Sequence, residues 1–546
     1  MNTNNASHVP APGRTHADFD VVVIGAGLSG LYQLYRLRRS GLKALVFEAG
    51  DGIGGTWFWN RYPGARVDSQ SHVYQYWFSK EIHEDWTWSE RFCAQPELER
   101  YINFIADRCG LWDDIQLGTR VTGLRYDDNG RCWHVETDRG DRVTAQFVVS
   151  CTGMLSAPLT DLFPGQKRFR GELYHTARWP KTPVVFEGKR VGVVGTGATG
   201  IQVIQTIAPL VTQLKVFQRT PQYTIQMNNW RWNEPDHKQL HARFDELKQR
   251  VHNTFAGFDF DFERGSYHAL TPAQRRDALE ELWHDGTLAF WVGSFPEVLV
   301  DENVNADVTA FVREKMRARI ERPELAAKLI PTRYGFGTRR VPLETHYLEA
   351  YNRDNVELVD ISQTPIREIT EKGVRTAAGE YELDMLIFAT GFDAATGALT
   401  RIDIRGREGR TLKEKWGEDI RTAMGLQLHG FPNFFMTGAP LAPSAAFCNM
   451  TTCLQQQVDW ITDTICYLRD RGRQTIEPTA EKEEQWLQHH EEIANATLLV
   501  KTDSWYLGSN VKGKQRRLLS YVGGVAAYRQ QCDQVMAAGY PGFVMA

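Results

Sequence analysis

The sequence lacks the features that mark membrane, secreted and nucleic-acid-binding proteins. Its 546 residues contain no apolar run near the roughly 18 residues needed to cross a bilayer, and residues 1–18 lack the apolar stretch of a signal peptide. Asp and Glu (67) slightly outnumber Lys and Arg (63), so no basic excess attracts nucleic acid or an anionic membrane. We therefore expect a cytoplasmic protein with small-molecule partners, no obligatory protein partner and a flexible tail over residues 1–18.

Cysteine is scarce as well. The eight cysteines include no CxxC pair, and Cys448 and Cys453 are the closest two. Without a secretion signal or ligand-spaced His and Cys, we expect all eight to be free thiols in a reducing cytoplasm. The QHHEE run at residues 488–492 lacks the i, i+4 histidine spacing of a helical metal site, so it predicts a solvated helix surface. We predict no metal site in this chain.

The residues that are present indicate a globular chain of several domains. Apolar residues make up 42% of the sequence and charged residues 24%, which is typical of proteins with buried cores. At about 150 residues per domain, the length predicts roughly three or four domains.

The first informative stretch is FDVVVIGAGLSG. Residues 19–24 form a continuous apolar run typical of a buried parallel strand, and Gly25, Gly27 and Gly30 follow it as GxGxxG at the start of a helix. The first glycine makes the tight turn, the second admits a pyrophosphate, and the third lets the helix pack on the strand. A second strand ends in Glu48, 18 residues past Gly30, where a carboxylate suits an unphosphorylated ribose. The pattern predicts a dinucleotide site.

The same pattern recurs 170 residues later in KRVGVVGTGATG, with Gly195, Gly197 and Gly200. The strand that follows, QLKVFQRT, ends in Arg219 and Thr220 instead of an acid. A cation and a hydroxyl suit a 2′-phosphate, which a carboxylate would repel. We expect NADPH at this second site; the alternative is that Arg219 only ends a strand at the surface.

Two segments that end in Thr-Gly, residues 147–153 and 386–392, indicate where the chain crosses between nucleotide domains. We predict an α/β fold of two nested Rossmann-like dinucleotide-binding domains with doubly wound sheets and a helical insertion. The first domain would comprise residues 19–154 and 385–546, and the second residues 155–225 and 331–384. The insertion, residues 226–330, carries a Thr271-Pro272 helix start and two apolar stripes. The stripes, which we expect to pack in the core, are Leu240, Phe244, Leu247 and Val251, and Val308, Val312, Met316 and Ile320.

Two dinucleotide sites are compatible with disulfide reductases, flavin monooxygenases and several oxidases. Residues 52–78 carry no cysteine, which excludes thiol redox chemistry at the first site. Residues 169–180, FRGELYHTARWP, match FxGxxxHTxxWP, and GGTWFWNRYPGARVD, VFQRTP, FGTRRVPLE, ATGFDAATGAL and SWYLGSNVKGK stand in the expected order. From about residue 19 to 515 the sequence resembles the type I Baeyer–Villiger monooxygenases, which are class B flavoprotein monooxygenases that use FAD and NADPH.

The resemblance assigns residues to both cofactors. For FAD it implies Gly25, Gly27, Gly30, Glu48, Thr56, Trp57, Asp68 and Met450, and for NADPH it implies Gly195, Gly197, Gly200, Arg219, Thr220 and Arg339. The family commonly has Lys where this chain has Arg339, and either cation can hold a 2′-phosphate. Trp505 matches a tryptophan of a mobile loop that closes over the nicotinamide end; the alternative is an ordinary buried aromatic. We expect His175 of the fingerprint to stabilise a hinge and not to do chemistry.

The resemblance also implies a reaction and a catalytic pair, Arg340 and Asp68. NADPH reduces the flavin, O₂ adds at flavin C4a, and the peroxyflavin attacks a ketone as an anion to give an ester or lactone. A guanidinium beside the peroxide favours its anionic form and stabilises the oxyanion of the adduct. Asp68 would pair with Arg340 and hold it in place, unless the two form a buried pair that only joins two domains.

Two other functions stay open on the sequence alone. A flavin-dependent N- or S-oxygenase would use a protonated peroxide, which gains nothing from a neighbouring cation. An NADP(H)-sensing flavoprotein would make no oxygenated product. For the ketone itself, residues 437–450 with Phe447 form an apolar wall, so we expect a moderately bulky or cyclic substrate.

Overall fold

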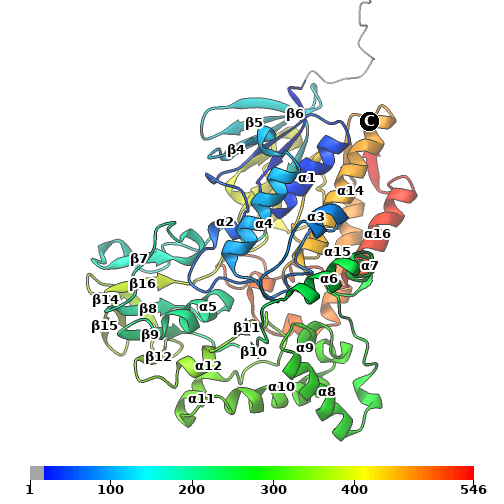
Figure 1. Ribbon diagram of the computed structural model, residues 1–546. Coiled ribbons are helices and arrows are strands. Elements are labelled where there is room, and N and C mark those ends of the chain that lie inside the picture. The colour runs from blue at the N-terminus through cyan, green and yellow to red at the C-terminus, as the bar shows by residue number, and fades with distance from the viewer. Residues whose placement is uncertain (1–16) are drawn as a thin grey trace, which may run out of the picture.

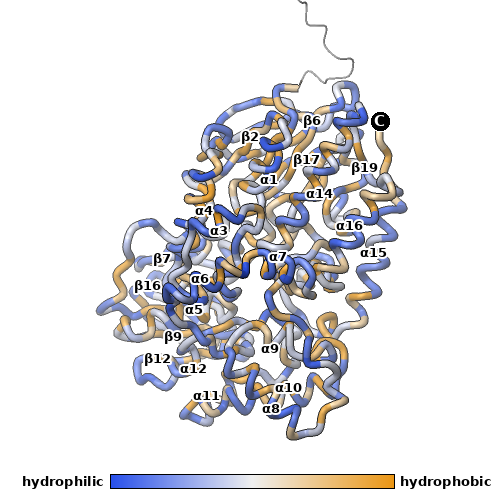
Figure 2. The backbone as a smooth tube through the Cα atoms, turned by 45° about the vertical axis from the view of Figure 1, so that its right-hand side comes forward, coloured by the Kyte–Doolittle hydropathy of each residue, from blue (hydrophilic) through white to orange (hydrophobic). Residues whose placement is uncertain are grey.

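The computed structural model describes residues 17–546, so all but the last two residues of the predicted tail lie outside the described part. Figure 1 shows the first sheet at the top, a second sheet at the lower left, and helices α8 (Pro272–Asp285), α10 (Glu302–Arg317) and α11 (Pro323–Leu329) along the bottom. In Figure 2 hydrophobic residues follow sheet strands, while α6 (Glu234–Ala242) is largely hydrophilic. This is the predicted α/β architecture with two sheets and a helical insertion.

The first sheet is built from two distant parts of the chain. Its order is β17-β4-β5-β6-β1-β2-β3, with β18 paired to β6. The strands are β1 (Phe19–Ile24), β2 (Ala44–Phe47), β3 (Ile115–Gln116), β4 (Val121–Asp127), β5 (Cys132–Thr137), β6 (Arg142–Ser150), β17 (Asp403–Arg405) and β18 (Phe434–Met436). The apolar run of β1 pairs in parallel with β2 and β6. One face of β1 packs with helices α1 (Leu28–Arg39) and α14 (Met450–Asp470), and the other face packs with residues of β4, β5 and β18, so the strand is buried on both faces. Residues after 400 therefore return to the sheet that begins the chain.

The second sheet is wholly parallel, in the order β12-β9-β8-β16-β7. Its strands are β7 (Glu172–His175), β8 (Arg190–Val194), β9 (Gln213–Gln218), β12 (Val356–Asp360) and β16 (Met385–Phe388). The predicted boundary at residue 385 is wrong, because β16 pairs with β7 and β8 instead of joining the first sheet. Its fully buried run MLIF lies between two parallel neighbours, so the chain crosses back only after Phe388.

The insertion is helical, as predicted. Besides α6, α8, α10 and α11 it contains α7 (Phe244–Asn253) and the short α9 (Ala289–Val292). Thr271 caps α8 by accepting a hydrogen bond from the Gln274 backbone N–H. The first predicted stripe spans two helices, because the helix is interrupted at Arg243, which lies between α6 and α7. Leu240 is only half-buried, whereas the other members of both stripes are buried.

Two expectations about cysteine and histidine are corrected. Cys448 and Cys453 form a disulfide with their Cα atoms 6.9 Å apart, so the prediction of eight free thiols is wrong for this pair. Cys448 lies two residues before α14 and Cys453 lies in its first turn, which brings them together without a CxxC spacing. His490 is buried and contacts the Leu518 carbonyl oxygen through Nε2 at 2.6 Å, so the QHHEE run is not a wholly solvated surface.

Within residues 17–546, no helix combines the length and the apolar character that crossing a membrane requires.

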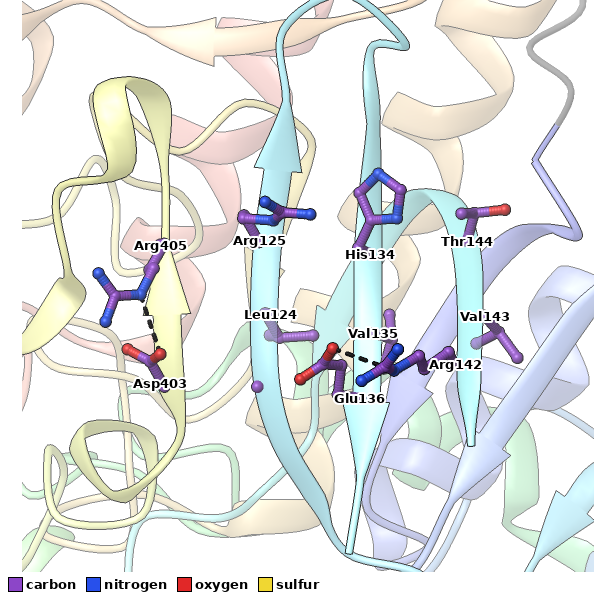
Figure 3. A pocket seen from close by; sticks show the side chains of 11 residues that line it. Leu124, Arg125, His134, Val135, Glu136, Arg142, Val143, Thr144, Asp403 and Arg405 are labelled. Carbon is purple, nitrogen blue, oxygen red and sulfur yellow. Dashed lines mark hydrogen bonds and ion pairs between the residues drawn. The ribbon is translucent and has the colours of Figure 1, made fainter. Parts of the chain in front are cut away.

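A cavity of about 350 Å³ lies on the face of the first sheet over β4, β5, β6 and β17. Figure 3 shows charged side chains along it, with Arg142 facing Glu136 and Arg405 facing Asp403. None of the glycine turns lines this cavity, and neither does Arg340. Of the predicted functional residues, Arg340 and Asp68 contact each other elsewhere in the molecule.

Candidate active site and cofactor sites

The first glycine turn joins the end of β1 to the start of α1. A Cβ on Gly25 (φ +101°) would lie 2.7 Å from the Cys151 carbonyl oxygen, and a Cβ on Gly30 would lie 1.8 Å from the Gly25 carbonyl oxygen. Gly27 is the N-cap of α1, and its added Cβ would stand 3.4 Å from the Gly55 Cα, an ordinary contact distance. Only glycine fits at positions 25 and 30, and the backbone N–H groups of this turn open at a helix N-terminus. These residues fit the pyrophosphate of a dinucleotide.

Glu48 is held at the carboxyl end of β2 by the same turn. Its carboxylate accepts hydrogen bonds from the backbone N–H groups of Ala26 and Gly50, each at 2.7 Å. Burial raises the pKa of Glu48, and the two hydrogen bonds lower the pKa by a smaller amount. Because a carboxylate can accept up to about four hydrogen bonds, Glu48 retains acceptor capacity for ribose hydroxyls.

Three further residues assigned to FAD lie on helix starts of this domain. Thr56 begins α2 (Thr56–Trp59) and is exposed, whereas Trp57 is buried and donates its indole N–H to the Tyr74 hydroxyl at 3.2 Å. Met450 begins α14 and is half-buried against the same core. Thr56 and Met450 are 394 positions apart in the chain.

The second glycine turn repeats the first. A Cβ on Gly195 (φ +109°) would lie 2.4 Å from the Ala389 carbonyl oxygen, and one on Gly200 would lie 2.1 Å from the Gly195 carbonyl oxygen. Gly197, by contrast, faces open space, with no atom of the described residues within 4 Å of an added Cβ. The turn between β8 and α5 (Ala198–Ile207) therefore leaves room for a second pyrophosphate.

Arg339 and Arg219 place two positive charges near this second turn. Arg219 follows β9 and is exposed, and Thr220 next to it accepts a hydrogen bond from the Thr196 hydroxyl at 3.1 Å. The Arg339 guanidinium lies 4.6 Å over the Tyr334 ring, and its buried Nε has no hydrogen-bond partner among the described residues. Burial lowers the pKa of Arg339, and the like charge of Arg219 lowers it further. A cation that has an unpaired buried donor and a second cation close by fits an anion such as a 2′-phosphate.

Arg340 and Asp68 are brought together although 272 residues separate them in the chain. The Arg340 guanidinium donates through Nη2 to the Asp68 carboxylate and through Nη1 to the Ala445 carbonyl oxygen at 3.0 Å. Burial lowers the pKa of Arg340, but the charge and hydrogen bond of Asp68, together with the nearby Tyr506 and Tyr74, raise the pKa overall. The Arg340 side chain is 17% exposed, so a fixed cation with unused N–H donors reaches open space.

The SWYLG segment closes one side of this pair. Trp505 is half-buried in a short 3₁₀ helix, Trp505–Leu507, and its ring centroid lies 4.4 Å from that of Tyr506. The Tyr506 hydroxyl donates to the Ala446 carbonyl oxygen at 3.1 Å, next to the carbonyl that Arg340 binds. The segment that carries Trp505 thus packs against the loop beside Arg340.

His175 links the two chain crossings. Its Nδ1 accepts a hydrogen bond from the Ala177 backbone N–H at 3.1 Å, so a proton on Nε2 can be donated to the Leu159 carbonyl oxygen at 3.2 Å. Nε2 is also 3.2 Å from the Thr390 hydroxyl. Burial lowers the pKa of His175, which favours this neutral form. Since Leu159 and Thr390 lie in the two connections between the sheets, the geometry agrees with a hinge role.

Sequence patterns missed one neighbour of the Arg340–Asp68 pair, Trp291 of α9. The guanidinium carbon of Arg340 lies 5.6 Å from the Trp291 ring centroid. Trp291 stands in the apolar run LAFWVGSF, where nothing distinguishes it from ordinary core residues. Only the packing of the insertion reveals the contact.

Known proteins resemble this chain over nearly its whole length. The family model described as flavin-binding monooxygenase-like matches residues 19–257. The chain is 55% identical over 527 residues to acetone monooxygenase (methyl acetate-forming) of Gordonia sp. (strain TY-5), which covers 96% of this chain and 99% of that protein. It is 39% identical to cyclopentanone 1,2-monooxygenase of Comamonas sp. (strain NCIMB 9872), with 96% of each chain covered. A crystal structure of OTEMO in complex with FAD and NADP is similar at a TM-score of 0.94 and 40% identity, covering 97% of this chain and 100% of that one.

Proposed function

The chain belongs to the Baeyer–Villiger monooxygenases, and from that premise we propose which of its residues hold the cofactors, which carry the reaction and which ketone it oxidises. The enzyme uses FAD and NADPH to insert one oxygen atom of O₂ next to the carbonyl of a ketone, which gives an ester or a lactone. When bound, the reduced flavin supplies the activated oxygen.

FAD lies against the first glycine turn, in the domain formed by residues 19–154 and 389–546. Gly25, Gly27 and Gly30 admit the pyrophosphate, and Glu48 accepts hydrogen bonds from the ribose hydroxyls. Thr56, Trp57, Asp68 and Met450 complete this site. The glycine cradle, in which a side chain would collide with the Cys151 and Gly25 carbonyl oxygens, supports the assignment.

NADPH lies against Gly195, Gly197 and Gly200, in the domain formed by residues 155–225 and 331–388. Arg339 and Arg219 hold the 2′-phosphate, with Thr220 beside them. The unpaired Nε of Arg339 is the observation that supports this assignment, because a buried donor without a partner costs free energy unless a ligand satisfies it. Trp505 covers the nicotinamide end. Because the reaction consumes NADPH, a cytoplasmic location belongs to the same proposal.

Arg340 is the catalytic residue, and Asp68 positions it. The raised pKa keeps the guanidinium protonated, so its positive charge stabilises the oxygen that becomes negative as the ketone carbonyl is attacked. Asp68 and the Ala445 carbonyl oxygen occupy two of the five N–H donors and fix the plane of the group. Asp68 itself exchanges no proton with the substrate. The contact between Arg340 and Asp68 is the single observation that carries the proposal.

The substrate is a small aliphatic ketone, which replaces the bulkier ketone suggested by the apolar segment 437–450. Acetone monooxygenase, at 55% identity over nearly the whole chain, supports this choice. Buried rings also narrow the space beside Arg340: the ring centroid of Phe447 lies 5.2 Å from those of both Trp291 and Tyr506. Three packed rings leave little room for a large substrate.

A panel of acetone, butanone, cyclopentanone, cyclohexanone and phenylacetone tests the proposal, together with an amine and a sulfide. We expect the highest kcat/KM with acetone or butanone, and esters identified by mass spectrometry. A preference for phenylacetone or cyclohexanone would contradict the small-ketone substrate. Formation of N- or S-oxides without any ester would instead favour the heteroatom oxygenase and contradict the role of Arg340.

A further inference from the structure

We propose that Trp291 is a positioning residue for the reaction, because it holds both the guanidinium of Arg340 and the backbone of the loop that carries it. This inference rests on the proposed function of Arg340. Trp291 belongs to the helical insertion, in α9, and its side chain is fully buried. Because it is buried, the Trp291 ring offers a fixed surface on which the Arg340 side chain packs.

The first contact is between the guanidinium and the ring face of Trp291. The Arg340 carbon Cζ lies 5.6 Å from the Trp291 ring centroid, within the distance at which a cation is attracted to the negative face of an indole. The attraction is strongest in a desolvated site, and both groups are removed from most water. The ring has no acceptor that competes for N–H donors, so it orients Arg340 without using the donors that the reaction needs.

The second contact is with the loop. The Trp291 indole N–H donates to the Gly337 carbonyl oxygen at 3.1 Å, three residues before Arg340. Gly337 has φ +77°, and a Cβ there would stand 2.6 Å from the Trp291 Nε1, so this close approach requires glycine. The same indole therefore fixes where the loop backbone lies and where its charged group points.

The remaining contacts of the guanidinium explain why a third support is needed. Asp68 and the Ala445 carbonyl oxygen accept hydrogen bonds from two N–H groups at the edge of the guanidinium. Trp291 adds a contact of a different kind, between the guanidinium and an aromatic ring. It also packs on Phe447 with ring centroids 5.2 Å apart, which ties the loop of Ala445 to the same indole.

Two substitutions at this position separate the contacts. Trp291→Phe keeps an aromatic face but loses the bond to Gly337, and Trp291→Leu loses both. We expect Trp291→Leu to lower kcat/KM for ketone oxygenation about 10- to 30-fold, the equivalent of a desolvated cation–π contact. Trp291→Phe should restore part of this loss. Flavin reduction by NADPH in the absence of O₂ should stay within about twofold of the parent rate in both variants, since hydride transfer needs no charge from Arg340.

Trp283→Leu is the matched control. Trp283 is a partly buried tryptophan of α8 in the same insertion, and its ring packs on Phe290 at 5.6 Å. We expect this variant to lose stability without a change in the ester formed per NADPH consumed. Crystal structures add a readout that does not depend on turnover: in Trp291→Leu the guanidinium of Arg340 should leave the Ala445 carbonyl oxygen, and in Trp283→Leu it should stay.

A double-mutant cycle that combines Trp291→Leu with Arg340→Ala tests whether Trp291 acts through Arg340 or independently of it. If Trp291 acts through Arg340, adding Trp291→Leu to Arg340→Ala should cause no further loss of ketone oxygenation. A further loss of oxygenation in the double variant would overturn the inference. So would a Trp291→Leu variant in which flavin reduction falls as much as oxygenation, or one in which Arg340 keeps its position and oxygenation stays at the parent level. If Arg340→Ala alone retained parent-level oxygenation, the proposed function of Arg340 would fail instead.

Discussion

Replacing Arg339 with alanine should remove most of the preference for NADPH over NADH. Arg339 offers a buried Nε that lacks a partner, and a hydrogen bond to a charged group contributes about 1.5–3 kcal/mol. That range corresponds to a loss of roughly 10- to 150-fold in kcat/KM for NADPH, with little change for NADH, which lacks the phosphate. Arg219 is exposed, so solvent screens its charge and Arg219→Ala should cost no more than about 5-fold.

Steady-state kinetics with both nicotinamides check this expectation. Arg339→Lys is the matched control, because it keeps the charge and should retain much of the preference. Without NADP⁺, Arg339→Ala should unfold at or above the parent temperature, since it removes the repulsion between Arg339 and Arg219. Equal losses with NADPH and NADH would refute the phosphate assignment and make Arg339 a structural residue.

Three further outcomes follow from the same contacts. Gly25→Ala should lose bound FAD and unfold at a lower temperature than Gly41→Ala, as measured by flavin content and thermal melts. Gly25 and Gly41 both have positive φ, but only at Gly25 would a Cβ lie 2.7 Å from a carbonyl oxygen. Asp68→Asn should lower the rate of ketone oxygenation about 10²-fold, while rapid mixing still shows reduction of the flavin. An equal loss of oxygenation and flavin reduction would mean that the Arg340–Asp68 contact has only a structural role. Burial lowers the pKa of His83, His252 and His490 from 6.5 to about 4. The unfolded chain therefore binds more protons than the folded one between these values, and the free energy of unfolding should fall as pH drops from 6.5 to 4; denaturant titrations that show no fall would contradict it.

Local sequence patterns predicted the parts of the site that depend on local geometry. The two glycine turns, the strands before them and the residues that end the next strands follow from short-range rules, and the structure has them where expected. The strand at residues 385–388 was assigned to the wrong sheet, because an apolar run such as MLIF suits a buried parallel strand of either sheet. Only its pairing with β7 and β8 decides which sheet it joins.

Long-range packing explains what the sequence could not reveal. Trp291 and Phe447 lie 156 positions apart, in apolar runs typical of any core, and they meet beside Arg340 only because the insertion folds over the loop before α14. The disulfide between Cys448 and Cys453 depends likewise on where α14 begins. Arg340 and Asp68 could be paired in advance only through the family resemblance, since no spacing rule spans 272 residues.

The central claim is that Arg340 serves the oxygenation of the ketone and not the reduction of the flavin. Rapid mixing of the Arg340→Ala variant with NADPH, followed by O₂ and acetone, separates the two half-reactions in one experiment. We expect flavin reduction to persist and ester formation to fall by about 10²- to 10³-fold, the usual cost of removing one preorganised charge contact. Ester formed by the variant at near the parental rate would contradict the claim.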